Sequence, residues 1–286
     1  MKLTIFKKIL RVTIAVLCIS LFLPTYVFAY DKQDIVGRPA MLLTAVSNDG
    51  SLADESIMGY ACADALLNAT DAELAFVCGG ELIANLEPKE QTYEQVSSVF
   101  KEPELGLATA EVTGLQLKEI LENGFSHIVI DETETIDKSQ SAFAGFPQVS
   151  GIRVIYDASQ PSGERVKHVY IDNKEIDLAD ENKHYILAST KNVFDGAYGY
   201  PKVSYQESNI SLAEAMADYI HKGTLDNYND INRVTAIGCT DYNIVNHFPL
   251  VQCVLAAMII WIMTRLWKYK LTGNDYHRLE KNWKGE

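Results

Sequence analysis

The sequence predicts a single α+β domain, and three observations carry this expectation. Amphipathic helical segments and short strand-like runs alternate in the first half of the chain, and strand-like runs dominate the second half. About 218 of the 286 residues lie between two apolar ends, enough for one sizeable core. No internal repeat interrupts this order, so one domain is expected rather than an array.

Four segments begin with a capping box, in which a Ser or Thr and an acidic or amide side chain three residues later satisfy the free amides of a helix start. The pairs are Ser51 with Asp54, Thr92 with Gln95, Thr113 with Gln116, and Ser211 with Glu214. Apolar residues recur at helical spacing in residues 57–66 and 212–220. We therefore expect amphipathic helices after these caps.

Five apolar runs have the length and composition of strands, namely residues 74–77, 107–112, 152–156, 166–171 and 184–188. The third and fourth are joined by residues 157–164, which are rich in turn formers, so residues 152–171 are predicted to form a hairpin. The polar stretch 131–141 is expected to be a surface loop.

The two ends of the chain predict export and a membrane anchor. Residues 1–29 have basic residues before an apolar stretch and end in Val27-Phe28-Ala29, a pattern typical of a secretory signal peptide. Residues 244–267 form an apolar segment long enough to cross a bilayer, although a buried core helix is the alternative. Cations follow this segment at once, which favours a cytoplasmic tail at residues 268–286 and an extracellular domain at residues 30–243. The expected location is thus the cell membrane, with one membrane pass.

The acidity of the domain argues against nucleic acid as a partner. The chain has 25 Lys and Arg against 38 Asp and Glu, a formal net charge of −13, and ten of the cations lie in the two ends. Three cysteines lie outside the ends, at positions 62, 78 and 239. A disulfide between Cys62 and Cys78 is one alternative, but buried thiols are favoured. No Cys or His spacing indicates a metal site, and no cofactor is expected.

Several segments together resemble a known family. They are residues 55–59 leading to 63–65, residues 75–80 (AFVCGG), residues 112–119, residues 145–157 (GFPQVSGIRVIYD) and residues 199–201 (GYP). This combination is similar to the C-terminal domain of 5'-nucleotidases, including the bacterial enzymes that also act as UDP-sugar hydrolases, over roughly residues 35–237. The resemblance implies a mixed sheet with packed helices.

In that family the C-terminal domain holds the nucleoside, whereas a separate metallophosphatase domain binds two metals and performs the hydrolysis. The patterns Gly-Asn-His-Asp and Gly-His-x-His, which the resemblance implies for such a metal site, do not occur in this sequence. We therefore expect no catalytic residue and no metal ligand in this chain.

The resemblance also implies a ligand site at the end of the first long strand. The family reads Asn-Gly-Gly-Gly-Ile-Arg where this chain reads Cys78-Gly79-Gly80-Glu81-Leu82-Ile83. The glycines allow a tight turn and a close approach of the backbone to a ligand, but the Asn and Arg that contact substrate are replaced. Ile83 cannot hydrogen-bond, and Glu81 would repel phosphate.

The family also sandwiches a base between two phenylalanines, and here only the first position matches. Phe146 occupies it, with a packing role as an equal alternative, while Asn192 falls at the second position. Phe194 lies two residues further on, and Tyr198 replaces an Asp. The predicted site is thus a degenerate nucleoside site formed by Cys78, Gly79, Gly80, Phe146, Asn192, Phe194 and Tyr198.

These patterns favour a membrane-anchored, non-catalytic binding or interaction module. One alternative is a component of nucleotide hydrolysis and catabolism that acts with a separate metallophosphatase, and another is a structural surface protein. The expected partners are the membrane, a weakly bound nucleoside or nucleotide, and a metallophosphatase or surface protein.

Overall fold

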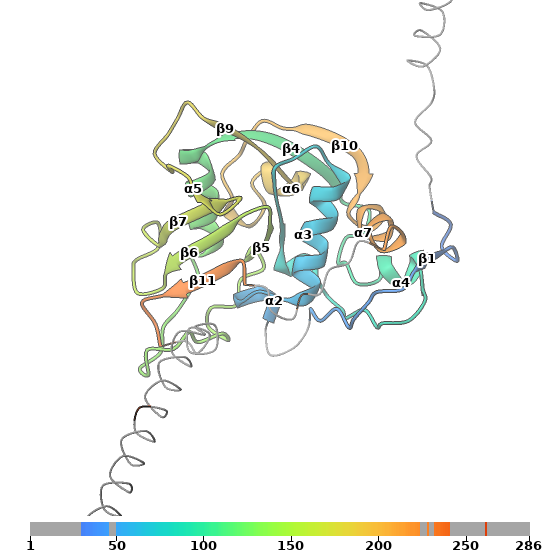
Figure 1. Cartoon of the computed structure of the whole chain (residues 1–286), viewed down its shortest axis with the longest axis horizontal. Coiled ribbons are helices and arrows are strands. Elements are labelled where there is room, and N and C mark those ends of the chain that lie inside the picture. The colour runs from blue at the N-terminus through green and yellow to red at the C-terminus, as the bar shows by residue number, and fades with distance from the viewer. Residues whose placement is uncertain (1–29, 46–49, 224–227, 229–231, 241–260, 262–286) are drawn as a thin grey trace, which may run out of the picture.

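The computed structural model describes residues 30–45, 50–223, 228, 232–240 and 261 (Figure 1). The predicted signal peptide, the predicted cytoplasmic tail and all of the predicted anchor except Trp261 lie outside the described residues. Within the described residues, none of the helices combines the length and the apolar character that a membrane span requires.

A five-stranded mixed sheet lies at the centre of the domain, in the order β10-β4-β9-β2-β5. The strands are β2 (Leu74–Cys78), β4 (Gly106–Thr113), β5 (Pro147–Ser150), β9 (His184–Thr190) and β10 (Gln206–Ser211). β2 and β9 run parallel, and the other neighbours are antiparallel. The predicted α+β class with a mixed sheet is confirmed.

A second sheet has the order β11-β6-β7-β8. β6 (Arg153–Asp157) and β7 (Val166–Ile171) pair antiparallel, which confirms the predicted hairpin, and β8 (Lys174–Glu175) continues it. β11 (Val234–Ile237), the last described strand in the sequence, pairs in parallel with β6. A short pair, β1 (Ile35–Gly37) and β3 (Gln91–Thr92), completes the strands.

The helices are α2 (Gly50–Ala53), α3 (Ile57–Ala69), α4 (Tyr93–Ser97), α5 (Gly114–Gly124), α6 (Lys191–Phe194) and α7 (Leu212–His221), with 3₁₀ turns η1 (Gly79–Glu81) and η2 (Ala197–Gly199). The capping boxes at Thr92, Thr113 and Ser211 are present with both reciprocal hydrogen bonds. These three predictions are confirmed.

The predicted box at Ser51 is wrong. α2 ends at Ala53, and α3 is capped by Ser56, whose hydroxyl accepts a hydrogen bond from the backbone amide of Gly59. The reason is Gln148 on β5, which donates to the carbonyls of Ser51 and Asp54 and accepts the amide of Ser56 at 2.9 Å. This distant side chain holds the turn between the two helices.

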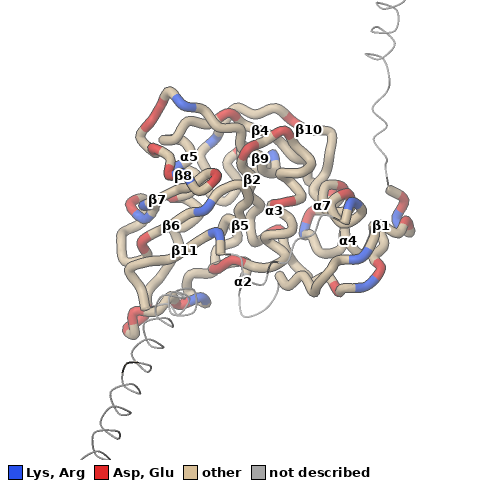
Figure 2. Tube along the Cα trace, in the orientation of Figure 1, with Lys and Arg blue, Asp and Glu red and all other residues tan. Residues whose placement is uncertain are grey.

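The central sheet separates two apolar cores, because side chains of a strand alternate between its faces. Ala75 and Val77 of β2 contribute to the core formed with α3, α4 and α7. Leu74, Phe76 and Cys78 contribute to the core formed with α5 and the second sheet. Figure 1 shows α3, α4 and α7 on the right of the domain and α5, β6 and β7 on the left. Acidic and basic residues are interspersed along the described chain (Figure 2).

Candidate functional site

The Gly79-Gly80 pair brings three backbone segments together at the end of β2. A Cβ on Gly79 would lie 1.6 Å from the carbonyl oxygen of Ser51, and one on Gly80 would lie 2.6 Å from Cβ of Ala144. The amides of the two glycines donate to the carbonyls of Phe146 and Ala144, each at 2.8 Å. The glycines are therefore required for close packing within the protein itself.

Glu81 ends this turn as a buried carboxylate. Its side chain is 1% exposed, and Oε1 accepts the hydroxyl of Tyr198 at 2.7 Å. No hydrogen-bond partner for Oε2 is present among the described residues. Ile83, where the family places its Arg, is 52% exposed. The turn is thus bordered by the buried acid Glu81 and the exposed apolar residue Ile83, and neither of them is a cation.

The two titratable neighbours of Glu81 stay protonated near neutral pH. Burial, reinforced by the charge of Glu81, raises the pKa of the Cys78 thiol well above its ordinary value. Burial and the hydrogen bond to Glu81 raise the pKa of the Tyr198 hydroxyl in the same direction. A neutral, fully buried thiol is a poor nucleophile, so Cys78 has no features of a catalytic cysteine.

Tyr198, which hydrogen-bonds Glu81, lies in a strained turn. Tyr198 has φ of +55°, in the left-handed region, and it lies between Gly196 (φ +99°) and Gly199 (φ +78°). Such a conformation costs a residue with a Cβ roughly 1–2 kcal/mol. The carbonyl of Tyr198 accepts from Nδ2 of Asn123 at 3.2 Å, which helps to hold the turn.

The aromatic residues predicted for the base clamp lie in the core. Phe146 is 1% exposed and packs edge-on against Phe125 at 5.7 Å between ring centroids. Phe194 is 2% exposed and stacks with Tyr205 at 5.9 Å. In this conformation neither Phe146 nor Phe194 offers a ring face to a ligand. For Phe146, this burial corresponds to the packing role that was the alternative to base stacking.

The predicted residues are only partly brought together. Cys78, Phe146 and Phe194 belong to one apolar core, and Tyr198 reaches the turn through Glu81. Asn192 instead accepts the hydroxyl of Thr190 at 2.7 Å. Whether any of these residues binds a ligand stays a prediction.

Sequence reasoning missed Phe143 as a neighbour of this turn. Its ring is half-buried and stacks on His127, with centroids 4.0 Å apart. Phe143 and Tyr198 both approach Gly145, at 2.5 and 2.8 Å from the position of an ideal Cβ. The only signal in the sequence was an aromatic residue shortly after a polar loop and two positions before the GFPQVSG segment.

A second concentration of buried charge lies under α3. The guanidinium of Arg233 binds Asp64 through two hydrogen bonds of 2.7 and 2.9 Å, and Tyr228 donates to the same carboxylate at 3.0 Å. Glu55 accepts the amide of Arg233 at 3.0 Å, and burial raises its pKa to about 8. This cluster attaches the start of β11 to α3, so we assign it a structural role.

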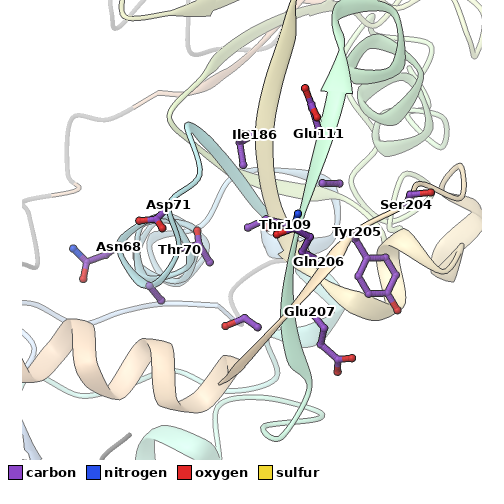
Figure 3. Close-up of a pocket in the computed structure, with 13 residues that line it drawn as sticks. Asn68, Thr70, Asp71, Thr109, Glu111, Ile186, Ser204, Tyr205, Gln206 and Glu207 are labelled. Carbon is purple, nitrogen blue, oxygen red and sulfur yellow. The ribbon is translucent and has the colours of Figure 1, made fainter. Parts of the chain in front are cut away.

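An open groove beside the central sheet is separate from the Gly79-Gly80 turn. Figure 3 shows it between the C-terminal end of α3, at Asn68 to Asp71, and the strands that carry Thr109, Glu111 and Gln206. Its volume is about 800 Å³. Two acidic residues of the groove have partners. Oε1 of Glu111 lies 3.4 Å from Nδ1 of His184, and Oε1 of Glu207 lies 2.8 Å from Nζ of Lys191. In the described part of the chain, no group of three or more His, Cys, Asp or Glu residues could hold a metal ion.

Comparison with known proteins gives a consistent assignment. Residues 38–205 match the family described as 5'-nucleotidase, C-terminal domain. The trifunctional nucleotide phosphoesterase protein YfkN of Bacillus subtilis is 29% identical over 169 residues, which are 58% of this chain and 11% of that protein.

Solved structures share the fold. A 5'-nucleotidase precursor from Thermus thermophilus superposes with a TM-score of 0.60 at 22% identity, over 72% of this chain and 40% of that one. The NAD nucleotidase of Haemophilus influenzae superposes with a TM-score of 0.53 at 20% identity, over 72% and 39%. The chain therefore spans about two fifths of these enzymes.

Proposed function

Because this chain belongs to the 5'-nucleotidase C-terminal domain family, we propose that it is a non-catalytic binding module with a degenerate nucleoside site at the Gly79–Glu81 turn. In this proposal residues 1–29 direct export, residues 244–267 anchor the chain in the membrane, and residues 268–286 lie in the cytoplasm. The observation that carries the proposal is the turn itself, in which the buried carboxylate of Glu81 follows the two glycines and the exposed Ile83 stands at the position of the substrate-contacting Arg of the resembled enzymes.

Magnitudes support a weak site for adenosine or AMP. An intact site of micromolar affinity corresponds to about −8 kcal/mol. Two missing charge-assisted hydrogen bonds remove roughly 1.5–3 kcal/mol each. A missing stacking face removes roughly 1–3 kcal/mol more. At best about −4 kcal/mol remains, which corresponds to millimolar binding.

Isothermal titration of adenosine and AMP into the purified protein tests the site. We expect no dissociation constant below about 0.1 mM for either ligand. AMP is expected to bind no more tightly than adenosine, because Glu81 repels its phosphate. Micromolar binding of AMP would contradict the proposal, since it requires cationic contacts that the turn does not offer.

Phosphate release tests the absence of catalysis. With Zn²⁺, Mn²⁺ or Mg²⁺ added, the purified protein is expected to release no phosphate from AMP above a buffer control. The control against a contaminating phosphatase is a second, unrelated column. Metal-dependent turnover that follows the protein through both columns would show that the chain is an enzyme.

A second candidate function is cooperation with a separate metallophosphatase. It is favoured by the coverage, because the matched segment is only 11% of the Bacillus subtilis relative and 40% of the Thermus structure. A neighbouring gene for a lone metallophosphatase would identify the partner to test, whereas an adhesion or secretion gene cluster would favour a structural surface protein. In the first case, adding this chain to the partner should lower the KM of that partner for a nucleotide.

Protease protection tests the proposed topology. Protease added outside intact cells should digest an epitope inserted after Asp137, in a loop whose residues 131–134 and 139–140 are exposed, and should spare an epitope at Glu286. Lysed cells serve as the control, because both epitopes should then be digested. Protection of the first epitope in intact cells, or digestion of the second, would refute the proposed orientation.

A further inference from the structure

We propose that the Gly79–Glu81 turn selects a ligand that presents two adjacent N–H donors on a flat group, as the edge of a guanine base or a guanidinium does. Phosphorylated ligands and adenine are disfavoured. This inference rests on the proposed function, because it assumes that the turn still binds a nucleoside-like ligand. It deepens that function by naming the donor pattern that the ligand must have.

The starting point is the incomplete hydrogen bonding of Glu81. Its side chain is 1% exposed, so water does not readily compensate its charge, and Oε2 has no partner among the described residues. A buried carboxylate oxygen without a donor is destabilising, and native proteins rarely leave one. Tyr198 supplies a single O–H to Oε1 at 2.7 Å. The carboxylate can therefore accept at least one further donor, on Oε2.

The neighbouring side chains do not provide that donor as a cation. The Cys78 thiol lies close enough for the charge of Glu81 to act on it, but it is a weak donor and stays neutral. Leu82 and Ile83 follow in the chain and are apolar. An incoming positive or N–H-bearing group would thus meet a negative site, whereas an incoming phosphate would be repelled.

Tyr198 hydrogen-bonds Glu81 and is the more exposed of the two residues. It is half-buried, in contrast to the fully buried Glu81, and its turn has glycines on both sides with positive φ. Its hydroxyl occupies one carboxylate oxygen as a ligand N–H would. Rotation of this one side chain would free Oε1 of Glu81 for a ligand N–H.

Two half-buried aromatic residues lie near the same place. A Cβ on Gly145 would lie 2.5 Å from Cζ of the Phe143 ring and 2.8 Å from Cβ of Tyr198. One face of the Phe143 ring stacks on His127. Phe143 belongs to neither of the two apolar cores. Flat heterocycles and guanidinium groups stack on aromatic faces. The rings therefore suit the same ligands as the carboxylate does.

Donor geometry then separates the bases. A guanine presents its ring N–H and its exocyclic amine side by side, so both can bind one carboxylate, as in bidentate Arg–carboxylate pairs. An adenine presents one amine beside a ring nitrogen that accepts, and this acceptor faces the negative carboxylate. Hypoxanthine keeps the ring N–H but lacks the exocyclic amine. The expected order of affinity is guanosine, then inosine, then adenosine.

The test is isothermal titration of guanosine, inosine, adenosine and arginine into the full chain in detergent micelles. Guanosine is expected to bind at least about tenfold more tightly than adenosine, the factor of one charge-assisted hydrogen bond. The titration with arginine tells the two ligand classes apart. If arginine binds and guanosine does not, the ligand is a guanidinium group. The preference should disappear in Glu81→Gln, which keeps an acceptor for Tyr198, and persist in the control Glu90→Gln, an exposed residue of the next loop.

Tyr198→Phe gives a second measurement in case Glu81→Gln does not fold. It removes the hydroxyl that competes for Oε1 and keeps the ring, so it should bind guanosine more tightly than wild type does. Weaker binding by this variant would overturn the inference. Equal millimolar affinity for all three nucleosides would also overturn it while leaving the proposed nucleoside site intact. Absence of binding by every nucleoside and by arginine would overturn both.

Discussion

Breaking the ion pair between Arg233 and Asp64 should destabilise the domain more than any exposed charge substitution. Arg233→Met keeps most of the apolar stem but removes the guanidinium. The two side chains are 16% and 12% exposed, so Asp64 would be left as a largely buried charge. Removal of one partner of a buried pair typically costs about 3–5 kcal/mol of the free energy of unfolding.

The structure places the expected loss at the lower end of that range. Asp64 retains two hydroxyl donors, Ser150 and Tyr228, after the substitution. Arg233 also donates to the carbonyl of Val149 at 2.9 Å, a bond worth about 1 kcal/mol, and lies over the ring of Tyr60 at 5.0 Å. We therefore expect a loss of about 3 kcal/mol in the free energy of unfolding.

Urea unfolding followed by far-UV circular dichroism measures this loss. The matched control is Lys191→Met, which breaks the exposed pair with Glu207 and should leave the transition unchanged. Asp64→Asn combined with Arg233→Met should be less destabilised than the sum of the single variants, since the buried charge is then removed as well. A loss for Arg233→Met no larger than that of the control would refute the structural role of this pair.

Three further predictions concern the stability of the described domain. Burial raises the pKa of Glu55 from 4.5 to about 8, so between these values the folded state retains a proton that the unfolded state has released. Stability should therefore fall as pH rises through this window, by at most about 1.4 kcal/mol per unit. A urea series in Glu55→Gln should be flatter, and a flat wild-type profile would show that the pKa is not raised. Gly151→Ala should lower the melting temperature more than Gly163→Ala: both have positive φ, but only at Gly151 would a Cβ collide, 2.2 Å from the carbonyl of Glu73. Equal melting temperatures would rule out the collision. Phe125→Ala removes a fully buried ring and should cost about 3–5 kcal/mol in the same urea assay. A cost below about 2 kcal/mol, the lower end for truncating a large core side chain to Ala, would contradict its central position.

Local patterns in the sequence were sufficient for the elements that depend on neighbouring residues. Three capping boxes and the hairpin of β6 and β7 are as predicted, because a capping box or a tight turn is formed within a few residues. The family assignment was also accessible, because it rests on short segments such as GFPQVSGIRVIYD that residues 38–205 include. Export and anchoring follow from the apolar ends alone and stay predictions.

Only the tertiary structure decided features that join distant residues. β10 (QESNIS) has no apolar alternation and is a strand because it pairs with β4, and the helix start moved from Ser51 to Ser56 because Gln148 binds the turn between them. Burial of Phe146 and the contact between Glu81 and Tyr198, 117 residues apart, depend on how the sheet stacks on its neighbours. Composition and spacing determine which residues are apolar or able to hydrogen-bond. Which of them meet is set by packing, because each buried group is stabilised or destabilised by partners that the local sequence does not contain.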